Sequence, residues 1–361
     1  MAAIPAQANH FALVVLDDDF TCPSILPIPG ADEYDPTRRI RPRPGSDNDS
    51  SVTYDRRTQV EGSPSRSPVS FGPTVAVLGA ATLFGTTGTA LAKGPAGIEA
   101  LSAGSLRLLI GGAALCIAGR AVLFRDLKRL RRHNFSMILL GGLTVAAYQL
   151  GFFWATETTG VALATVVTIG TSPLVSRMIG SLRRRPAPDR WWVASAIGLI
   201  LGLVLLVLGS ANGTSVDFDA VGVLAAVLAG ASYAAYTEVG SVMMVGGWHS
   251  TSAMAAMFFS AGLLTAPVLL VRDLTWVGSV AGLTVILYLS LITLTLAYIW
   301  FGWGLHSLAP TTVVMLTMFE PVVAAILAIL VLDETLSALS WFGIAFVLIG
   351  LVVVGLRSRS S

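Results

Sequence analysis

The sequence predicts an all-α polytopic membrane protein, with ten transmembrane helices arranged as two inverted five-helix repeats around a central cavity. Three observations lead to this fold class: an apolar composition, a series of apolar segments of spanning length, and self-similarity between two halves of the chain. Of the 361 residues, 54% are hydrophobic and only 12% are charged, which is about half the charged content of a soluble domain. Such a composition cannot cover a water-soluble surface, so we expect the chain to lie in a lipid bilayer.

Ten apolar segments follow one another along the chain, and most are close to the length of about 20 residues that a helix needs to cross a bilayer. They are 74–92, 100–121, 135–157, 161–182, 190–210, 219–241, 250–271, 277–304, 309–331 and 337–356. Residues 1–70 are rich in proline and charge instead, a composition typical of a disordered tail. We therefore divide the chain into a cytoplasmic tail (1–70), a first repeat (74–210) and a second repeat (219–356).

The basic residues of the loops predict the orientation in the membrane. If the N-terminus is inside, the inner connections and the C-terminal tail hold twelve Lys and Arg residues, whereas the outer connections hold only Lys93 and Arg272. Cytoplasmic loops carry an excess of Lys and Arg. We therefore expect both termini to be cytoplasmic, in a plasma or inner membrane.

Shifting the chain by 148 residues aligns its two halves without a gap. The matches that apolar composition alone does not explain place Pro173 on Pro321 and Gly202 on Gly350. Each half contains five spans, and two copies with an odd number of spans must lie in opposite orientations. Inverted repeats of this kind are typical of secondary transporters, whose substrate site lies near the membrane midplane where the halves meet.

Several motifs in the two halves are more specific than composition. The last third contains FEPVVAAILAILVLDETL (319–336) and a glycine-containing tenth segment, and the first half contains TLFGTTG (82–88), Arg107 and TIGTSPLVSRMIG (168–180). In these features the chain resembles the EamA family of the drug/metabolite transporter superfamily. The resemblance implies a basket of helices that moves small metabolites, often amino acids or related compounds and often outward. The sequence departs from the family pattern at Phe84, where tryptophan is common, and at Pro186, the repeat equivalent of Glu334.

Glu320 is the ionisable residue that lies nearest the middle of the ninth segment. Charged groups inside a membrane are costly and therefore indicate a function or a specific partner. Pro321 follows it and has no N–H group, so the carbonyl of Thr317 is expected to be free. A carboxyl group beside a free carbonyl can bind an amine, a cation or a proton. The alternative is a protonated glutamate that makes a structural hydrogen bond between helices.

Pro173 is expected to interrupt the fourth segment in the same way, with Thr168 and Ser172 close to it. These hydroxyls could line the cavity or simply pack between helices, where small residues are common. Two broken helices at equivalent positions of the two repeats would form the midplane site.

Arg107 lies about seven residues into the second segment. It could bind a substrate carboxylate, pair with Glu157 at the end of the third segment, or extend toward the lipid headgroups. We favour a gating or structural role for Arg107. The family resemblance implies a structural role for Glu334 as well.

Aromatic and amide side chains deep in the spans complete the predicted cavity. Tyr148, Tyr233 and Trp300 lie deepest among the aromatic residues and offer ring faces to apolar or cationic parts of a substrate. Gln149 lies deep in the third segment. The alternative for the aromatic residues is packing or an interfacial belt.

The predicted function is alternating-access transport of small metabolites, amino acids or related amphoteric compounds, with export slightly favoured. The expected partners are this substrate and the lipid bilayer, with a proton as the candidate coupling ion; the oligomeric state is left open. A net charge of +2 does not suggest a nucleic-acid partner, and we expect no cofactor and no metal, because no His pair has metal-ligand spacing. A membrane receptor or scaffold, or less readily a membrane-embedded enzyme, remains an alternative, although no GxSxG or P-loop motif is present.

Overall fold

The computed structural model describes residues 72–128, 132–210 apart from 184, 186 and 188, 219–333, and 335–357. These residues all belong to one compact unit, Arg66–Ser361. The predicted tail, 1–70, lies outside the described residues.

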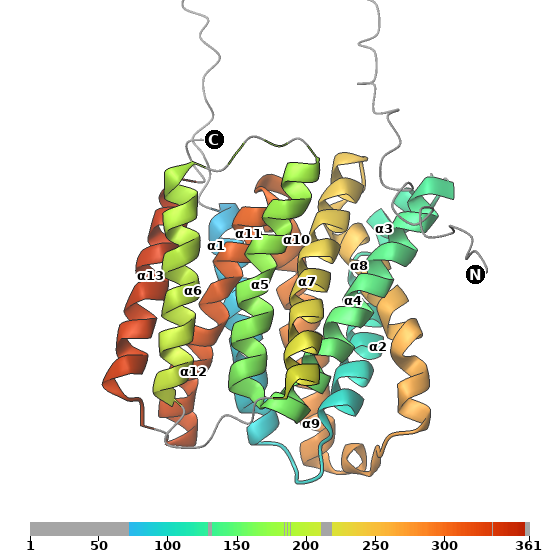
Figure 1. Cartoon of the computed structure of the whole chain (residues 1–361). Coiled ribbons are helices and arrows are strands. Elements are labelled where there is room, and N and C mark those ends of the chain that lie inside the picture. Colours follow the sequence, from blue (N-terminus) through green and yellow to red (C-terminus); the bar gives the residue numbers. More distant parts are fainter. Residues whose placement is uncertain are drawn as a thin grey trace, which may run out of the picture. The chain divides into compact units, whose positions relative to one another are not determined.

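The described chain is a bundle of helices (Figure 1). Its helices are α1 (Gly72–Ala92), α2 (Ala100–Ala118), α3 (Arg120–Leu127), α4 (Arg132–Thr159), α5 (Val161–Leu182), α6 (Arg190–Ser210), α7 (Ala220–Val245), α8 (Ser250–Thr265), α9 (Val280–Ser290), α10 (Ala297–Ser307), α11 (Pro310–Leu316), α12 (Glu320–Leu332) and α13 (Ala338–Arg357). Short 3₁₀ turns, Ala266–Leu270, Thr275–Gly278 and Thr317–Phe319, and a π-helical turn, Leu291–Leu296, connect some of them.

Ten stretches of these helices are long and apolar enough to cross a membrane, which confirms the predicted number of spans. Each of the first five spans runs antiparallel to its equivalent among the last five, as α1 and its equivalent α7 show (Figure 1). We call the face where α1 begins and α13 ends the terminal face, and the other the opposite face. The terminal face carries the α2–α4, α5–α6, α7–α8 and α10–α11 connections.

Contacts between the two repeats hold the bundle together. Helix α6 packs along α13 and α2 packs along α8, so that each pair joins equivalent spans of the two repeats. Helix α7 packs against α4 and α5, and its equivalent α1 packs against α10 and α12. Glycines allow these backbones to approach closely: a Cβ atom on Gly202 would lie 2.8 Å from the carbonyl oxygen of Gly343. Small residues serve the same purpose in membrane helices generally.

The structure departs from the predicted segments at four places. The seventh segment is α-helical only as far as Thr265, and the 3₁₀ turn Ala266–Leu270 follows it. The second segment ends at Ala118, and a separate helix, α3, follows it at the terminal face. The eighth and ninth spans each consist of two α-helices, because the π-helical turn separates α9 from α10 and a 3₁₀ turn separates α11 from α12.

Helix α3 is anchored by a buried carboxyl group. Asp126 is 4% exposed and accepts a hydrogen bond from the backbone N–H of His249 at 2.9 Å. Burial opposes ionisation of Asp126, but the hydrogen bond from the His249 N–H and the neighbouring Arg125 guanidinium hold its pKa below the ordinary value. The contact joins α3 of the first repeat to the start of α8 in the second.

The α6–α13 contact gives a test of the fold. Replacing Gly202 with valine forces side-chain atoms against the backbone of α13, and overpacking of this kind costs about 1–3 kcal/mol. We expect Gly202→Val to lower the thermal unfolding temperature of the detergent-purified protein. Gly198, one turn earlier on α6, has no atom within 4 Å of a Cβ position, so Gly198→Val is the matched control. Equal unfolding temperatures for the two variants would contradict this packing.

Candidate functional site

A small cavity lies in the middle of the bundle, between the two repeats. Its volume is about 60 Å³. Its walls come from α1, α2, α4 and α5 of the first repeat and from α7, α8, the π-helical turn, α10, the 3₁₀ turn and α12 of the second. The lining residues are Phe84, Thr87, Arg107, Tyr148, Gln149, Phe152, Phe153, Ile169, Tyr233, Tyr236, Phe258, Leu294, Tyr298, Thr317 and Glu320.

The acidic residue of the cavity stands at the break in the ninth span. Glu320 is the first residue of α12, directly after the 3₁₀ turn Thr317–Phe319, and Pro321 takes the second position, where a missing N–H is tolerated. Gly85 of α1 packs onto this point, since a Cβ atom there would lie 2.7 Å from the Glu320 carbonyl oxygen. The break therefore positions a carboxyl group at the cavity wall.

The basic residue of the cavity is held by the π-helical turn. Arg107 Nη2 donates a hydrogen bond to the carbonyl oxygen of Thr293 at 2.9 Å. A π turn inserts one extra residue into a helix and is frequent at functional sites. The Nε atom of Arg107 is buried and has no hydrogen-bond partner in the described structure. One side of the guanidinium is thus fixed on the protein, while a donor remains for an anionic ligand.

Four tyrosines form much of the remaining wall. Tyr233 Oη lies 2.6 Å from Thr317 Oγ1, so this hydrogen bond ties α7 to the break in the ninth span. Tyr236 Oη and Tyr298 Oη are 2.9 Å apart. The ring centroids of Tyr148 and Tyr233 are 5.5 Å apart. These contacts combine apolar ring faces with fixed hydroxyl groups, an arrangement suited to an amphipathic ligand.

The structure brings some of the predicted site residues together and separates others. Of the predicted residues, the cavity is lined by Glu320, Thr317, Tyr148, Gln149, Tyr233 and Arg107. Trp300 does not line it: this side chain is 37% exposed on the outside of α10, and its ring covers Gly79 of α1. Pro321 is buried behind the cavity wall.

The fourth span also differs from the prediction. Pro173 lies inside α5, which continues from Val161 to Leu182 without a break. Thr168 Oγ1 donates to the carbonyl oxygen of Ala226 on α7, and Ser172 Oγ donates to the carbonyl oxygen of Thr168. These hydroxyls satisfy backbone carbonyls and do not line the cavity, where α5 contributes Ile169 alone.

The Arg107–Glu157 pair, one of the three alternatives for Arg107, is not formed in the described structure. Arg107 is held by Thr293 instead, while Glu157 is exposed at the end of α4. Glu334 lies outside the described residues.

Sequence reasoning missed Tyr298, Thr293, Thr87 and Phe258 at the site. The only signal for the first two was the excess length of the eighth segment. A π turn rotates the residues that follow it by about 100° relative to a regular helix. This rotation is the reason that the aromatic residue of the eighth span facing the cavity could not be assigned from the sequence.

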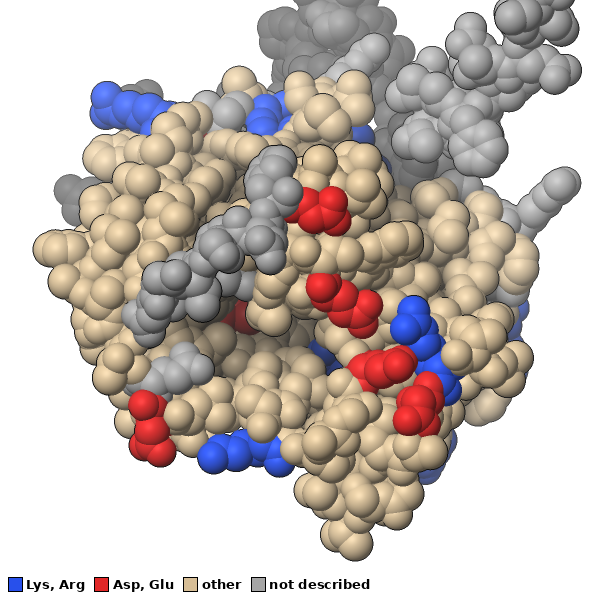
Figure 2. All heavy atoms as spheres, turned by 60° about the horizontal axis from the view of Figure 1, so that its bottom comes forward, with Lys and Arg blue, Asp and Glu red and all other residues tan. Residues whose placement is uncertain are grey.

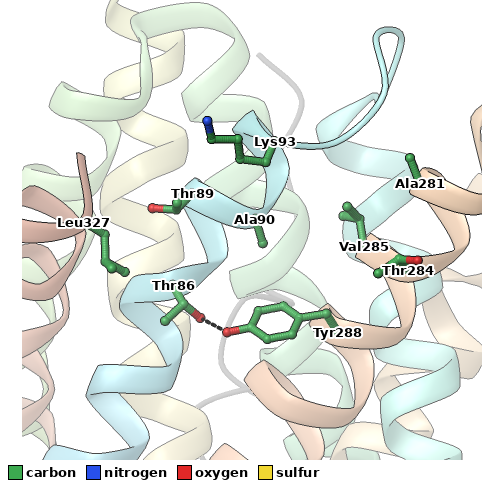
Figure 3. Close-up of a pocket in the computed structure, with 9 residues that line it drawn as sticks. All are labelled: Thr86, Thr89, Ala90, Lys93, Ala281, Thr284, Val285, Tyr288 and Leu327. Carbon is green, nitrogen blue, oxygen red and sulfur yellow. Dashed lines mark hydrogen bonds between the residues drawn. The ribbon is translucent and has the colours of Figure 1, made fainter. Parts of the chain in front are cut away.

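A second pocket, of about 520 Å³, lies nearer the opposite face between α1, α9 and α12 (Figure 3). Lys93 stands at its rim, and Tyr288 Oη donates to Thr86 Oγ1 at 2.9 Å on its floor. The volume of this pocket is that of an ordinary small-molecule site, whereas the volume of the central cavity is smaller. The central cavity has room for only a few water molecules.

The opposite face is hollowed near its centre, and acidic side chains gather around the hollow (Figure 2). The described loops and helix ends at this face carry five acidic residues and two basic ones, namely Glu99, Glu157, Asp219, Asp273 and Asp333, with Lys93 and Arg272. No group of three His, Cys, Asp or Glu side chains that could hold a metal ion occurs among the described residues.

In the part of the chain that the structure describes, ten membrane-spanning helices form two inverted repeats around a cavity that contains one acidic and one basic residue, and this arrangement defines the class of membrane transporters. The comparison with known families agrees. The chain belongs to the EamA-like transporter family, which it matches twice, over residues 73–208 and 220–356. This confirms the family and the fold class predicted from the sequence. A multi-pass membrane protein of this family works on a small-molecule substrate within the lipid bilayer.

The proteins similar to this chain include one curated relative and one solved structure. One is a Bacillus subtilis (strain 168) protein named uncharacterized transporter YwfM, 36% identical over 285 residues, which are 78% of this chain and 93% of that protein. The other is a solved crystal structure with a TM-score of 0.67, which covers 80% of this chain and 98% of its own. At 19% identity, the second similarity supports the fold alone.

The buried Tyr236–Tyr298 hydrogen bond gives a test of the cavity wall. Removal of one hydroxyl leaves the other without its partner, at a cost of about 1–3 kcal/mol, whereas removal of both costs less than the sum. We expect Tyr236→Phe and Tyr298→Phe each to lower the thermal unfolding temperature, and the double variant to lie no lower than the worse single variant. Strictly additive shifts would show that the two hydroxyls are not coupled.

Proposed function

We propose that the protein transports small amphoteric metabolites, amino acids or related compounds, by alternating access to the central cavity. The single observation behind this proposal is that Arg107 of the first repeat and Glu320 of the second line one cavity with aromatic walls. A solute that carries both a carboxylate and an amine matches these two charges.

The chemistry of each group supports an assigned role. Arg107 has one side on the Thr293 carbonyl and an unpartnered Nε, so its guanidinium is oriented to receive a carboxylate. Glu320 offers a carboxylate for the amine, and the ring faces of Tyr148 and Tyr298 accept the cationic or apolar part. Because no ion pair within 4 Å joins Arg107 to Glu320 in the described structure, both groups remain available for the substrate.

The cavity volume of about 60 Å³ supports a mechanism with a conformational change. A metabolite needs several times that volume, so the repeats must separate around the cavity when the substrate binds. Rocking of inverted repeats about a midplane site provides such a change.

The distribution of basic loop residues supports a cytoplasmic terminal face, in a plasma or inner membrane. We propose export as the direction. We also propose a proton as the coupling ion and Glu320 as its carrier, since intramembrane carboxyl groups commonly serve as proton relays.

Transport in proteoliposomes tests the role of Glu320. Vesicles loaded with an unlabelled amino-acid mixture are given radiolabelled amino acids one at a time, and the exchange is measured. We expect at least one amino acid to exchange, and Glu320→Gln or Arg107→Gln to lower its rate at least tenfold. Trp300 lies outside the cavity, so Trp300→Phe is the control, and its exchange rate is expected to stay within twofold of the parent rate. Exchange at the parent rate in Glu320→Gln would refute the assigned site, and absence of exchange for every compound would favour a receptor or scaffold.

Proton coupling is tested separately on the unaltered protein. With an exchanged substrate identified, its addition to vesicles that contain a pH-sensitive dye is expected to change the internal pH, because an antiporter moves protons against the substrate. A substrate flux without any pH change would contradict the proton as coupling ion.

A further inference from the structure

We propose that the Arg185–Glu238 ion pair is a latch, which keeps the transport pathway closed at the terminal face and must break before the cavity opens there. The inference rests on the alternating-access function proposed above.

The latch joins the two repeats through a specific geometry. Arg185, in the connection after α5, places Nη1 and Nη2 each 2.8 Å from one of the two carboxylate oxygens of Glu238 on α7. Ser176 Oγ lies 3.3 Å from Glu238 Oε1. Bidentate arginine–carboxylate pairs are among the stronger polar contacts in proteins. The α5–α6 connection and α7 are thus fastened together at the terminal face.

Burial makes the pair depend on closure of this face. The Glu238 side chain is 4% exposed, whereas that of Arg185 is 31% exposed. A buried carboxylate that loses its partner is strongly unfavourable unless water replaces the partner. Opening of the terminal face would expose Glu238 to water, so the pair and the closed state stabilise each other.

The opposite face lacks the equivalent pair. The residue 148 positions before Glu238 is Ala90, and the residue 148 positions after Arg185 is Asp333. Ala90 and Leu327, which is the equivalent of Ile179 on α5, line the pocket of about 520 Å³ between α1, α9 and α12 (Figure 3). At the terminal face, the ion pair joins α7 to the end of α5. At the opposite face, the pocket lies between α1 and its neighbours α9 and α12.

The exposure of side chains toward the two faces agrees with this difference. From the cavity toward the terminal face, Tyr236 and Thr237 are fully buried. Toward the opposite face, Thr87 is half-buried, and Gly88 is exposed with no atom within 4 Å of a Cβ position. The hollow in Figure 2 lies on the same side. The structure is thus closed at the face that has the ion pair and more open at the face that lacks one.

The α2–α8 pair, in contrast, is linked at both ends. Asp126 accepts from the His249 N–H at the terminal face. At the opposite face, Trp276 Nε1 donates to Ser102 Oγ, and Arg272 lies 3.6 Å from Glu99. Links at both ends hold these elements together in either state, so Asp126 provides a control that also joins the two repeats at the terminal face.

Thiol labelling tests the latch without any substrate. Thr237→Cys is introduced on a background without the native cysteines (Cys22→Ser, Cys116→Ala). Labelling by a membrane-impermeant maleimide is then followed in membrane vesicles that expose the terminal face. We expect slow labelling in this parent and labelling at least tenfold faster after Glu238→Gln or Arg185→Gln. Asp126→Asn is expected to label at the parent rate.

The charge-swapped protein, Arg185→Glu with Glu238→Arg, separates charge pairing from packing. We expect its labelling to return toward the slow parent rate. Unchanged labelling in both single Gln variants would overturn the latch, as would fast labelling in the charge swap or equal acceleration by Asp126→Asn. Arg185→Gln changes a partly exposed residue and provides the test where Glu238→Gln lowers the yield of folded protein. The labelling is measured without substrate and does not depend on Arg107 or Glu320 binding one, so a failure of the proposed transport site is distinguishable from a failure of the latch.

Discussion

The architecture depends on one constraint of the bilayer, namely that every backbone N–H and C=O group must find a partner within the protein. Lipid offers no hydrogen bonds, so irregular backbone is tolerated at membrane depth only where protein or a water-filled cavity surrounds it. The two irregular turns that interrupt a span in its middle meet this condition, whereas the 3₁₀ turn Ala266–Leu270 lies at the end of its span. The π-helical turn Leu291–Leu296 and the 3₁₀ turn Thr317–Phe319 each contribute a residue to the cavity wall. The backbone is therefore irregular where the site lies, and each turn positions one charge.

These turns make two similar repeats unequal. The π turn supplies the carbonyl that holds Arg107, and the 3₁₀ turn ends at Glu320. The equivalents of these two charged residues in the other repeat are Ala255 and Ser172. Each repeat thus contributes one charge to a shared cavity, and neither repeat contains the whole site. This division makes substrate recognition sensitive to the relative position of the repeats, which is the requirement for coupling binding to movement.

The same inequality appears at the two faces of the membrane. At the terminal face, Glu238 is buried and paired with Arg185, while at the opposite face its equivalent is Ala90 beside a large pocket. An inverted repeat generates two states by exchanging the conformations of its halves, and identical halves would have equal stability in either state. A charged contact between the halves that is present at one face alone biases that equilibrium. The sequence differences between the repeats thus affect the equilibrium between the two conformational states as well as the recognition of a substrate.

The sequence by itself determined the membrane class, the number of spans, the inverted repeat and the family. These follow from composition, segment length and symmetry, which are properties of the chain that packing does not alter. It also placed Glu320, Arg107 and Tyr233 deep in the spans, because ionisable and aromatic side chains stand out there against an apolar background. Only the tertiary structure decided which face of each helix lines the cavity. Proline alone does not break a helix, since Pro173 lies inside the continuous helix α5 whereas Pro321 follows a 3₁₀ turn. One extra residue in the eighth span placed Tyr298 in the cavity and Trp300 outside it. Such a rotation depends on hydrogen bonds between helices, such as that of Thr295 to the Gly111 carbonyl oxygen, and therefore on contacts between residues far apart in the chain.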